Sequence, residues 1–204
     1  MTINAIKQAL CAISARIDEN KDYLVSLDQQ NGDGDLGISM SDGFHAVTAY
    51  LAGSEETDIG KALNKCGDAF NEAAPSSLGT IFAFAFKGMA KALKGKAECS
   101  LAELADAMHA GVENVMAKAG SKPGEKTILD ALCPAIEALK AHADTPPDIA
   151  FRAAAEAAQK GSEHTKDMRA VWGRAAYYGE KSIGTLDGGS VVGALLFQAI
   201  RDNT

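Results

Sequence analysis

Three aspartates lie close together near the start of the chain, separated by glycines. The segment reads Asp28-Gln-Gln-Asn-Gly-Asp33-Gly-Asp35, so three carboxylates fall within eight residues. Glycine lets the backbone turn sharply, and converging carboxylates repel one another unless a cation lies among them. Carboxylate oxygens are hard ligands that suit Mg²⁺ or Ca²⁺. The segment therefore predicts a metal site, and an exposed acidic loop is the simpler alternative.

A calcium-binding EF-hand loop is a further alternative for this segment. Asn31, Asp33 and Asp35 occupy alternate positions, and Asp42 falls at the twelfth. However, Leu36 stands where the sharp turn needs glycine, and Asp42 stands where a bidentate glutamate is expected. The pattern therefore favours a metal site of another kind.

A site for a phosphate ligand would need an unusual design in this chain. It has no GxxxxGK[ST] motif and no GxGxxG between a strand and a helix. Metal ions could instead bridge the carboxylates to phosphate oxygens, with backbone N–H groups at a helix start supplying further donors. Asp35-Leu-Gly-Ile-Ser39 leads directly into a predicted helix, as this design requires. Arg174, ahead of a loop with Asp187, is the best candidate for a contact to a phosphoryl group, and a structural salt bridge explains it equally well.

The elements that position these residues are predicted to be helices. Apolar residues recur at spacings of three and four, and no stretch of six or more residues alternates apolar with polar. Ser100 with Glu103, and Thr127 with Asp130, have the spacing of a helix capping box, and Pro134 predicts a kink. We expect about eight helices, beginning near residues 2, 38, 57, 77, 100, 127, 147 and 188, with a further helical stretch at 162–178 that stands alone or continues the seventh.

Glycine is concentrated in the joints between these helices. Residues 32–37, 121–124 and 184–189 interrupt the helical pattern, and the first and last of these joints also carry aspartates. If the three joints meet at one end of a helical bundle, they build a single polar site.

The overall composition excludes several classes of protein. The chain has 204 residues, 47% apolar and 23% charged, which is typical of a soluble globular protein with one domain over residues 1–204. The N-terminus lacks the pattern of a signal peptide, and no apolar run approaches the length of a membrane span, so we expect a cytoplasmic protein without membrane association. The net charge of −7 argues against nucleic-acid binding, and four scattered cysteines without a CxxC pair predict reduced thiols.

Taken together, these motifs resemble the dihydroxyacetone kinase L subunit (DhaL) family. The family pattern is an aspartate, four residues, then Gly-Asp-x-Asp-His-Gly-x-Asn-Met, and this chain has a similar segment from Asp28 to Met40. Further matches are Leu78-Gly-Thr80, Pro123-Gly-Glu-Lys-Thr-Ile-Leu-Asp130 and the block from Gly173 to Gly189. These ordered blocks cover most of the chain.

The chain also departs from the family pattern at several positions. The family histidine after the third aspartate is Leu36, the asparagine before Met40 is Ser39, and a glycine-rich stretch is replaced by residues 71–76. The proline after the late aspartate is Gly188, and the histidine ahead of that aspartate is Thr185. The three aspartates are retained, so the pattern indicates a divergent member of the family.

The resemblance implies a fold and a nucleotide site. The fold is an all-α closed barrel of eight antiparallel helices with the nucleotide at one end. Asp28, Asp33 and Asp35 would hold two Mg²⁺ ions that bridge the phosphates of ADP or ATP, and Arg174 would be the catalytic residue at the transferring phosphoryl group. The positions that match the family's nucleotide pocket are Leu36, Gly37, Ser39, Met40, Ala73, Ala74, Ile128, Arg174, Asp187 and Gly188.

The resemblance also implies a partner. In the family a histidine of a separate K subunit or domain binds the ketose covalently, and this chain lacks that part. We therefore expect a phosphotransferase that acts on dihydroxyacetone or a related short ketose only with a K-type partner. The phosphoryl donor would be ATP or a protein of the phosphotransferase system, and we also consider a homodimer. A noncatalytic nucleotide- or metal-binding regulatory or scaffold module is the alternative function.

Overall fold

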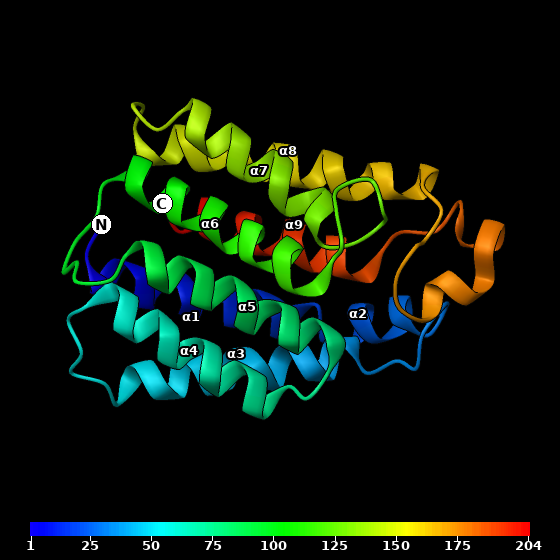
Figure 1. Cartoon of the computed structure of the whole chain (residues 1–204), viewed down its shortest axis with the longest axis horizontal. Helices are drawn as coiled ribbons and strands as arrows, with labels where there is room; N and C mark the ends of the chain where they lie inside the picture. Colours follow the sequence, from blue (N-terminus) through cyan, green and yellow to red (C-terminus); the bar gives the residue numbers. More distant parts are fainter.

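The computed structural model describes all 204 residues, and its regular elements are helices (Figure 1). There are nine α-helices and two short 3₁₀ segments. Their bounds are α1 Ile3–Glu19, α2 Lys21–Asp28, α3 Leu36–Ala52, α4 Ile59–Ala73, α5 Ser77–Ala92, α6 Leu101–Ala119, α7 Leu129–Ala141, α8 Pro147–His164, η1 Thr165–Asp167, η2 Arg174–Ser182 and α9 Gly188–Arg201. None of the helices is both long and apolar enough to cross a bilayer.

Eight of the helices, all except the short α2, form a closed ring. Starting with α1 and α3, each helix packs against the next, and α9 returns to α1. The all-α barrel of about eight helices is thereby confirmed. Because the chain runs up and down around the ring, the first residues of α3, α5, α7 and α9 gather at one end. Figure 1 shows the two chain termini at the opposite end.

The wall of the barrel is held together by apolar side chains on the inward face of each helix. On α1, apolar residues at spacings of three and four, Ile6, Leu10, Ile13 and Ile17, are buried. They join a hydrophobic cluster of 46 buried residues drawn from all nine helices. Inside the barrel lies a cavity of about 140 Å³ whose lining is entirely apolar. The interior of the barrel therefore offers no polar side chain to a ligand.

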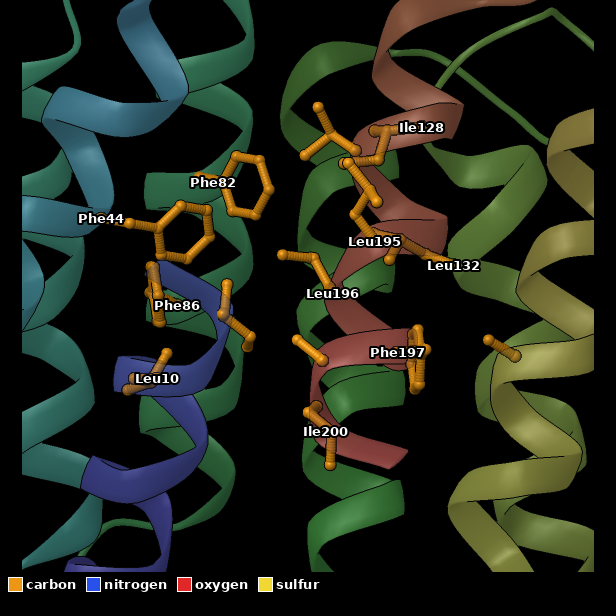
Figure 2. Packing of buried hydrophobic residues seen from close by; sticks show 14 of the residues in the cluster. Leu10, Phe44, Phe82, Phe86, Ile128, Leu132, Leu195, Leu196, Phe197 and Ile200 are labelled. Atoms are coloured by element: carbon orange, nitrogen blue, oxygen red, sulfur yellow. The ribbon is translucent and has the colours of Figure 1, made fainter. Parts of the chain in front are cut away.

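An aromatic group stiffens one side of this interior. The ring centroids of Phe70 lie 5.0 Å from Phe44 and 4.9 Å from Phe82, distances at which aromatic rings attract one another. Figure 2 shows Phe44, Phe82 and Phe86 on one side of the interior and residues of α9, including Leu196 and Ile200, on the other.

Short α2 was missing from the predicted elements. Only two of its side chains, Leu24 and Leu27, are buried, so its apolar pattern is too brief to indicate a separate helix. It lies at the end of the ring against α3 and α9. The approach to α3 is close, because a Cβ added at Gly37 would lie 2.2 Å from the carbonyl oxygen of Lys21. This contact places the start of α2 beside the first turn of α3.

The two predicted capping boxes had different outcomes. The box at Ser100 and Glu103 is confirmed, with both reciprocal hydrogen bonds present at the start of α6. The box at Thr127 and Asp130 is confirmed in part: α7 begins nearby, at Leu129, and the acid half of the box is present, but the Thr127 hydroxyl accepts from Leu129 instead of Asp130. The Asp130 carboxylate accepts from the backbone N–H of both Thr127 and Gly124. It therefore organises the preceding loop as well as the helix. Pro134 lies inside α7, and the kink there stays a prediction.

The helical stretch expected at 162–178 is interrupted in the structure, so the prediction of one continuous stretch is wrong. Helix α8 ends at His164, η1 follows, and the chain is irregular until η2 begins at Arg174. Gly173 and Gly179 have φ values of 66° and 56°, in the left-handed region that a continuous helix cannot include. We call residues 168–185 the arm. It extends from the same end of the barrel as the starts of α7 and α9 (Figure 1).

Candidate metal and nucleotide site

The three predicted metal ligands lie together at one end of the barrel. Asp28 ends α2, Asp33 lies in the following turn, and Asp35 precedes the first residue of α3. One carboxylate oxygen from each lies within 4.8 Å of the others. The turn is closed by a 2.7 Å hydrogen bond from the backbone N–H of Gly34, at φ 79°, to the Asp28 carboxylate. We call these three aspartates the acid trio.

Asp35 lies at a helix start but does not cap the helix. It is the N-cap residue of α3, where an aspartate commonly accepts a hydrogen bond from the helix, but its side chain makes no capping bond. Burial raises the pKa of Asp35, the charges of Asp33 and Asp28 raise it further, and Arg174 opposes the shift. A carboxylate that caps nothing and is repelled by two others is suited to a cation. The trio supplies three hard oxygen donors, so its chemistry fits Mg²⁺.

Arg174 approaches the acid trio from the arm. Its guanidinium donates to Asp33 across 2.5 Å, and its side chain is 66% exposed. A second contact joins the same two segments, because the Asn31 amide donates to the Thr185 hydroxyl at 3.2 Å. The predicted salt bridge is therefore present. An exposed ion pair contributes only about 0 to 1 kcal/mol, so it leaves the guanidinium free to exchange Asp33 for another anion.

Helix starts surround the acid trio. The Ser39 hydroxyl of α3 lies 2.6 Å from the hydroxyl of Ser76, which caps α5. At the start of α9, a Cβ added to Gly188 would lie 2.6 Å from Leu36. Two departures from the family pattern, Leu36 and Gly188, are thus in contact, and each fits because of the other. Backbone N–H groups at helix starts carry partial positive charge, so this end of the barrel favours an anion.

Asp187 marks the start of α9 next to this site. Its carboxylate accepts from the backbone N–H of Ser190 at 2.6 Å. Its side chain keeps some contact with solvent but loses most of its hydration, and this burial raises its pKa to about 7. The hydrogen bond from Ser190 and the charge of Lys126 oppose the shift, while Asp130 adds to it. A carboxyl group that changes charge near neutral pH therefore lies beside the acid trio.

The structure brings the remaining predicted pocket positions to the same end of the barrel. They lie in the first turns of α3, at the end of α4, before α7, in the arm and at the start of α9. Met40, Ala74 and Ile128 are almost fully buried within the hydrophobic cluster. A ligand would reach them only from the loop side. Their contact with a nucleotide stays a prediction for Leu36, Gly37, Ser39, Met40, Ala73, Ala74, Ile128, Arg174, Asp187 and Gly188.

Sequence reasoning missed a lysine at the centre of this end. The side chain of Lys126 is buried, and its ammonium donates to backbone carbonyl groups of four residues, Thr165, Met168, Ser182 and Thr185. Lysine is nearly always exposed, so the residue type gives no warning of this role. The only available signal was its place inside the matched block from Pro123 to Asp130.

Residues 30–202 match the family model of the DAK2 domain. The chain belongs to the DAK2 domain family. This DAK2 domain is 34% identical to the PEP-dependent dihydroxyacetone kinase 1, ADP-binding subunit DhaL of Listeria innocua, over 91% of the chain and 88% of the relative. The corresponding ADP-binding subunit DhaL of Escherichia coli is 30% identical over 88% of the chain and 86% of the relative. The resemblance to DhaL subunits is confirmed.

Longer kinases and solved structures also contain a similar domain. The L-erythrulose 1-kinase of Mycolicibacterium smegmatis is 30% identical over 96% of this DAK2 domain, which matches 34% of the relative. The dihydroxyacetone kinase of C. freundii superposes with a TM-score of 0.77, at 23% identity, over 98% of this chain and 34% of that one. A structure of that enzyme in complex with AMP-PNP and Mg²⁺ gives 0.78 at 22% identity, over 97% of this chain and 33% of that one. These structures confirm the barrel fold.

Proposed function

We propose that this chain is the nucleotide-carrying phosphotransfer subunit of a kinase for dihydroxyacetone or a related short ketose. The observation that carries the proposal is the convergence of Asp28, Asp33 and Asp35 at the start of α3, with Asp35 turned away from its capping role. The names of the relatives support it, since they describe ADP-binding subunits. The C. freundii complex supports Mg²⁺ and an adenine nucleotide as the ligands.

In this proposal the acid trio holds two Mg²⁺ ions, which neutralise the phosphates of ADP or ATP. Backbone N–H groups at the start of α3 supply further contacts, because no side chain caps them. Arg174 exchanges its exposed contact with Asp33 for the transferring phosphoryl group. Phosphoryl transfer depends mainly on positioning and charge stabilisation. A metal cage with one arginine is therefore sufficient without a protein nucleophile.

The acceptor would arrive at the exposed side of the same site. A pocket of about 270 Å³ lies there, lined by Asn31, Gly32, Arg174, Tyr177 and Tyr178. Tyr177 is 91% exposed, and Trp172 is also exposed. Aromatic residues and arginine are the types that most often stabilise protein interfaces. This face suits a K-type subunit that presents its covalently bound ketose to Arg174.

The source of the phosphoryl group distinguishes two forms of the proposal. The DhaL relatives are named as PEP-dependent, which favours a permanently bound ADP that a phosphotransferase-system protein rephosphorylates. The erythrulose kinases contain the domain within a longer chain and favour exchangeable ATP. Nucleotide analysis of the purified protein separates them, because bound ADP that survives gel filtration supports the first form and its absence supports the second.

Phosphoryl transfer to a ketose is the decisive test. The protein is incubated with Mg²⁺, a K-type subunit and a panel of short ketoses, with either ATP or a PEP-driven donor system. We expect ketose phosphate only when the K-type subunit is present. The matched variants are Asp35→Asn, which should abolish transfer, and Asp42→Asn, an exposed carboxylate further along α3 that should not. Nucleotide binding without transfer in every combination would instead support the noncatalytic module.

A further inference from the structure

Lys126 is the most deeply buried cation of the site end, with 4% of its side chain exposed. Its ammonium nitrogen donates to the carbonyl oxygens of Ser182 at 2.6 Å, Thr185 at 2.7 Å, Thr165 at 2.9 Å and Met168 at 3.3 Å. Four carbonyl oxygens converge on one ammonium, which has three N–H donors, so two of the oxygens share a donor. The N–H groups of a planar guanidinium point apart and could not converge in this way. Burial lowers the pKa of Lys126, and the charge of Asp187 opposes that shift.

The backbone of Lys126 accepts strain in order to make these bonds. Its φ of 61° is the only positive value in the chain at a residue other than glycine. The left-handed region is unfavourable for a side chain of this size. Such strain persists only where surrounding contacts enforce it. The hydrogen bonds from the ammonium to the carbonyl oxygens are those contacts. They keep the backbone of Lys126 in its left-handed conformation.

What the ammonium holds is the base of the arm. Thr165 and Met168 lie where the chain enters the arm, and Ser182 and Thr185 lie where it leaves. These acceptors are 39 to 59 residues from Lys126 along the chain. The arm is therefore closed into a loop whose two ends meet at one buried atom.

Outside its base, the arm has few strong contacts with the barrel. The Trp172 indole donates to Glu125, and Arg174 donates to Asp33, and both of these side-chain pairs are exposed. Solvent weakens exposed polar pairs, whereas buried hydrogen bonds to a charged group contribute about 1.5 to 3 kcal/mol each. The base is therefore the part that fixes where the arm, and Arg174 with it, lies.

We propose that Lys126 is a positioning residue, which closes the base of the arm and thereby holds Arg174 at the acid trio. This inference rests on the proposed function, in which Arg174 contacts the transferring phosphoryl group. The ammonium of Lys126 donates to none of the three aspartates of the acid trio. Its effect on transfer passes entirely through the placement of Arg174.

The first test is independent of activity. Lys126→Met keeps the length of the side chain and removes its donors, and Lys122→Met changes an exposed lysine of the same loop as the matched control. Hydrogen exchange is followed at the amides of Ala170 and Gly184, which are bonded within the arm and to its base. We expect exchange at both amides to accelerate at least about tenfold in Lys126→Met. Amides in the middle of α5 and α9 should be unchanged.

The second test asks whether Lys126 acts through Arg174. Transfer rates are compared in a double-mutant cycle of Lys126→Met with Arg174→Lys. We expect Lys126→Met to reduce transfer at least about tenfold in the wild-type background, with the affinity for Mg²⁺ and ADP changed by less than about threefold. In the Arg174→Lys background the further loss should stay below about threefold, because the residue that Lys126 positions has already been impaired.

Several outcomes would overturn the inference. Unchanged exchange in the arm would show that Lys126 does not hold it, and equal losses of transfer in both backgrounds would show that it acts independently of Arg174. If Lys126→Met fails to fold, Lys126→Gly replaces it, because glycine removes the ammonium and adopts the left-handed backbone without strain. Hydrogen exchange and transfer rates are then measured in Lys126→Gly in the same way. If the wild-type protein transfers to no ketose, the proposed function fails by itself. In that case, faster hydrogen exchange confined to the arm of Lys126→Met would still show that Lys126 closes the base of the arm. Unchanged exchange would still refute it.

Discussion

The two ends of the barrel are built from the same kind of helix start but use it differently. At the far end, Thr2, Asp58 and Ser100 each accept a hydrogen bond from the first turn of the helix that they begin, α1, α4 and α6. At the site end, Ser76 and Asp187 cap α5 and α9 in the same way, but the N-cap residues of α3 and α7, Asp35 and Ile128, make no such bond. Free donors at a helix start need another partner. At the far end only α8 lacks a side-chain cap, and its first residue, Pro147, has no N–H to satisfy. The site end leaves the starts of α3 and α7 open to a ligand.

This difference separates stability from function within one molecule. The wall and the far end consist of apolar packing and satisfied caps, which stabilise the fold without any ligand. The site end gathers three carboxylates and a half-buried aspartate, Asp187, whose pKa is raised. Each of these costs stability in the absence of a partner. Substitutions in the two regions should therefore have opposite signatures.

The largest loss of stability is expected in the wall, at Phe70. Its ring is fully buried among Phe44, Phe82 and Phe86. Phe70→Ala should lower the free energy of unfolding by about 4 kcal/mol, because it removes apolar contacts and leaves a cavity. Urea denaturation measures the change, and Phe84→Ala, at a half-buried ring of α5, is the control with a smaller expected cost. A large loss of nucleotide affinity in the folded fraction of Phe70→Ala would contradict the idea that the wall serves stability and the site end serves function.

The opposite signature is expected at Asp35. In Asp35→Asn the affinity for ADP with Mg²⁺ should fall more than about 100-fold, beyond the typical effect of losing a group that only supports a metal ligand. The metal-free protein should be as stable as the wild type or more stable, since one of three mutually repelling charges is gone. Calorimetric titration and urea denaturation give the two readings, with Asp42→Asn as the control. An unchanged affinity for ADP in Asp35→Asn, or in the wild type when EDTA removes Mg²⁺, would contradict a role of the acid trio in nucleotide binding.

The sequence predicted most readily those features that depend on nearby residues. The acid trio falls within eight residues, and the stripes of α1, α4 and α6 are periodic, so both the site and the ring of helices could be predicted. The arm could not, because its course depends on Lys126 and acceptors up to 59 residues away. The role of Asp130 was predicted only in part for a related reason, since its carboxylate accepts from Gly124 as well as from Thr127. Long-range polar contacts leave no periodic signal.

A pH dependence should distinguish the site end from the wall. The folded-state pKa of Asp187, about 7, lies above its usual value of 3.8. Between these values the folded protein binds more protons than the unfolded chain, so Asp187 reduces stability as the pH rises, by at most about 1.4 kcal/mol per unit. Asp187→Asn still caps α9 and should lose this slope. Urea denaturation of the metal-free protein from pH 4.5 to pH 8 tests it. Parallel curves for the two proteins would contradict a raised pKa.

The smallest effect on stability and affinity is expected at two serines that each cap a helix. They also give the most direct comparison of the two ends. Ser100 caps α6 at the far end, and Ser76 caps α5 at the site end, each accepting from a backbone N–H three residues later at 3.1 Å. Either serine changed to alanine should cost about 1 kcal/mol of unfolding free energy, the usual value for a lost cap. Only Ser76 also bonds Ser39 of α3, beside the acid trio.

Ser100→Ala should therefore leave the affinity for ADP with Mg²⁺ unchanged. Ser76→Ala should weaken it by a few-fold, about 0.5 to 1.5 kcal/mol, because the hydrogen bond that joins the starts of α3 and α5 is lost. Thermal unfolding measures the stability of each variant, and calorimetry measures its affinity for ADP with Mg²⁺. Equal affinities in the two variants would mean that the link between Ser39 and Ser76 serves only the fold. A loss of affinity in Ser100→Ala would mean that the far end of the barrel is coupled to the site through the wall, and the separation of the two ends would then be wrong.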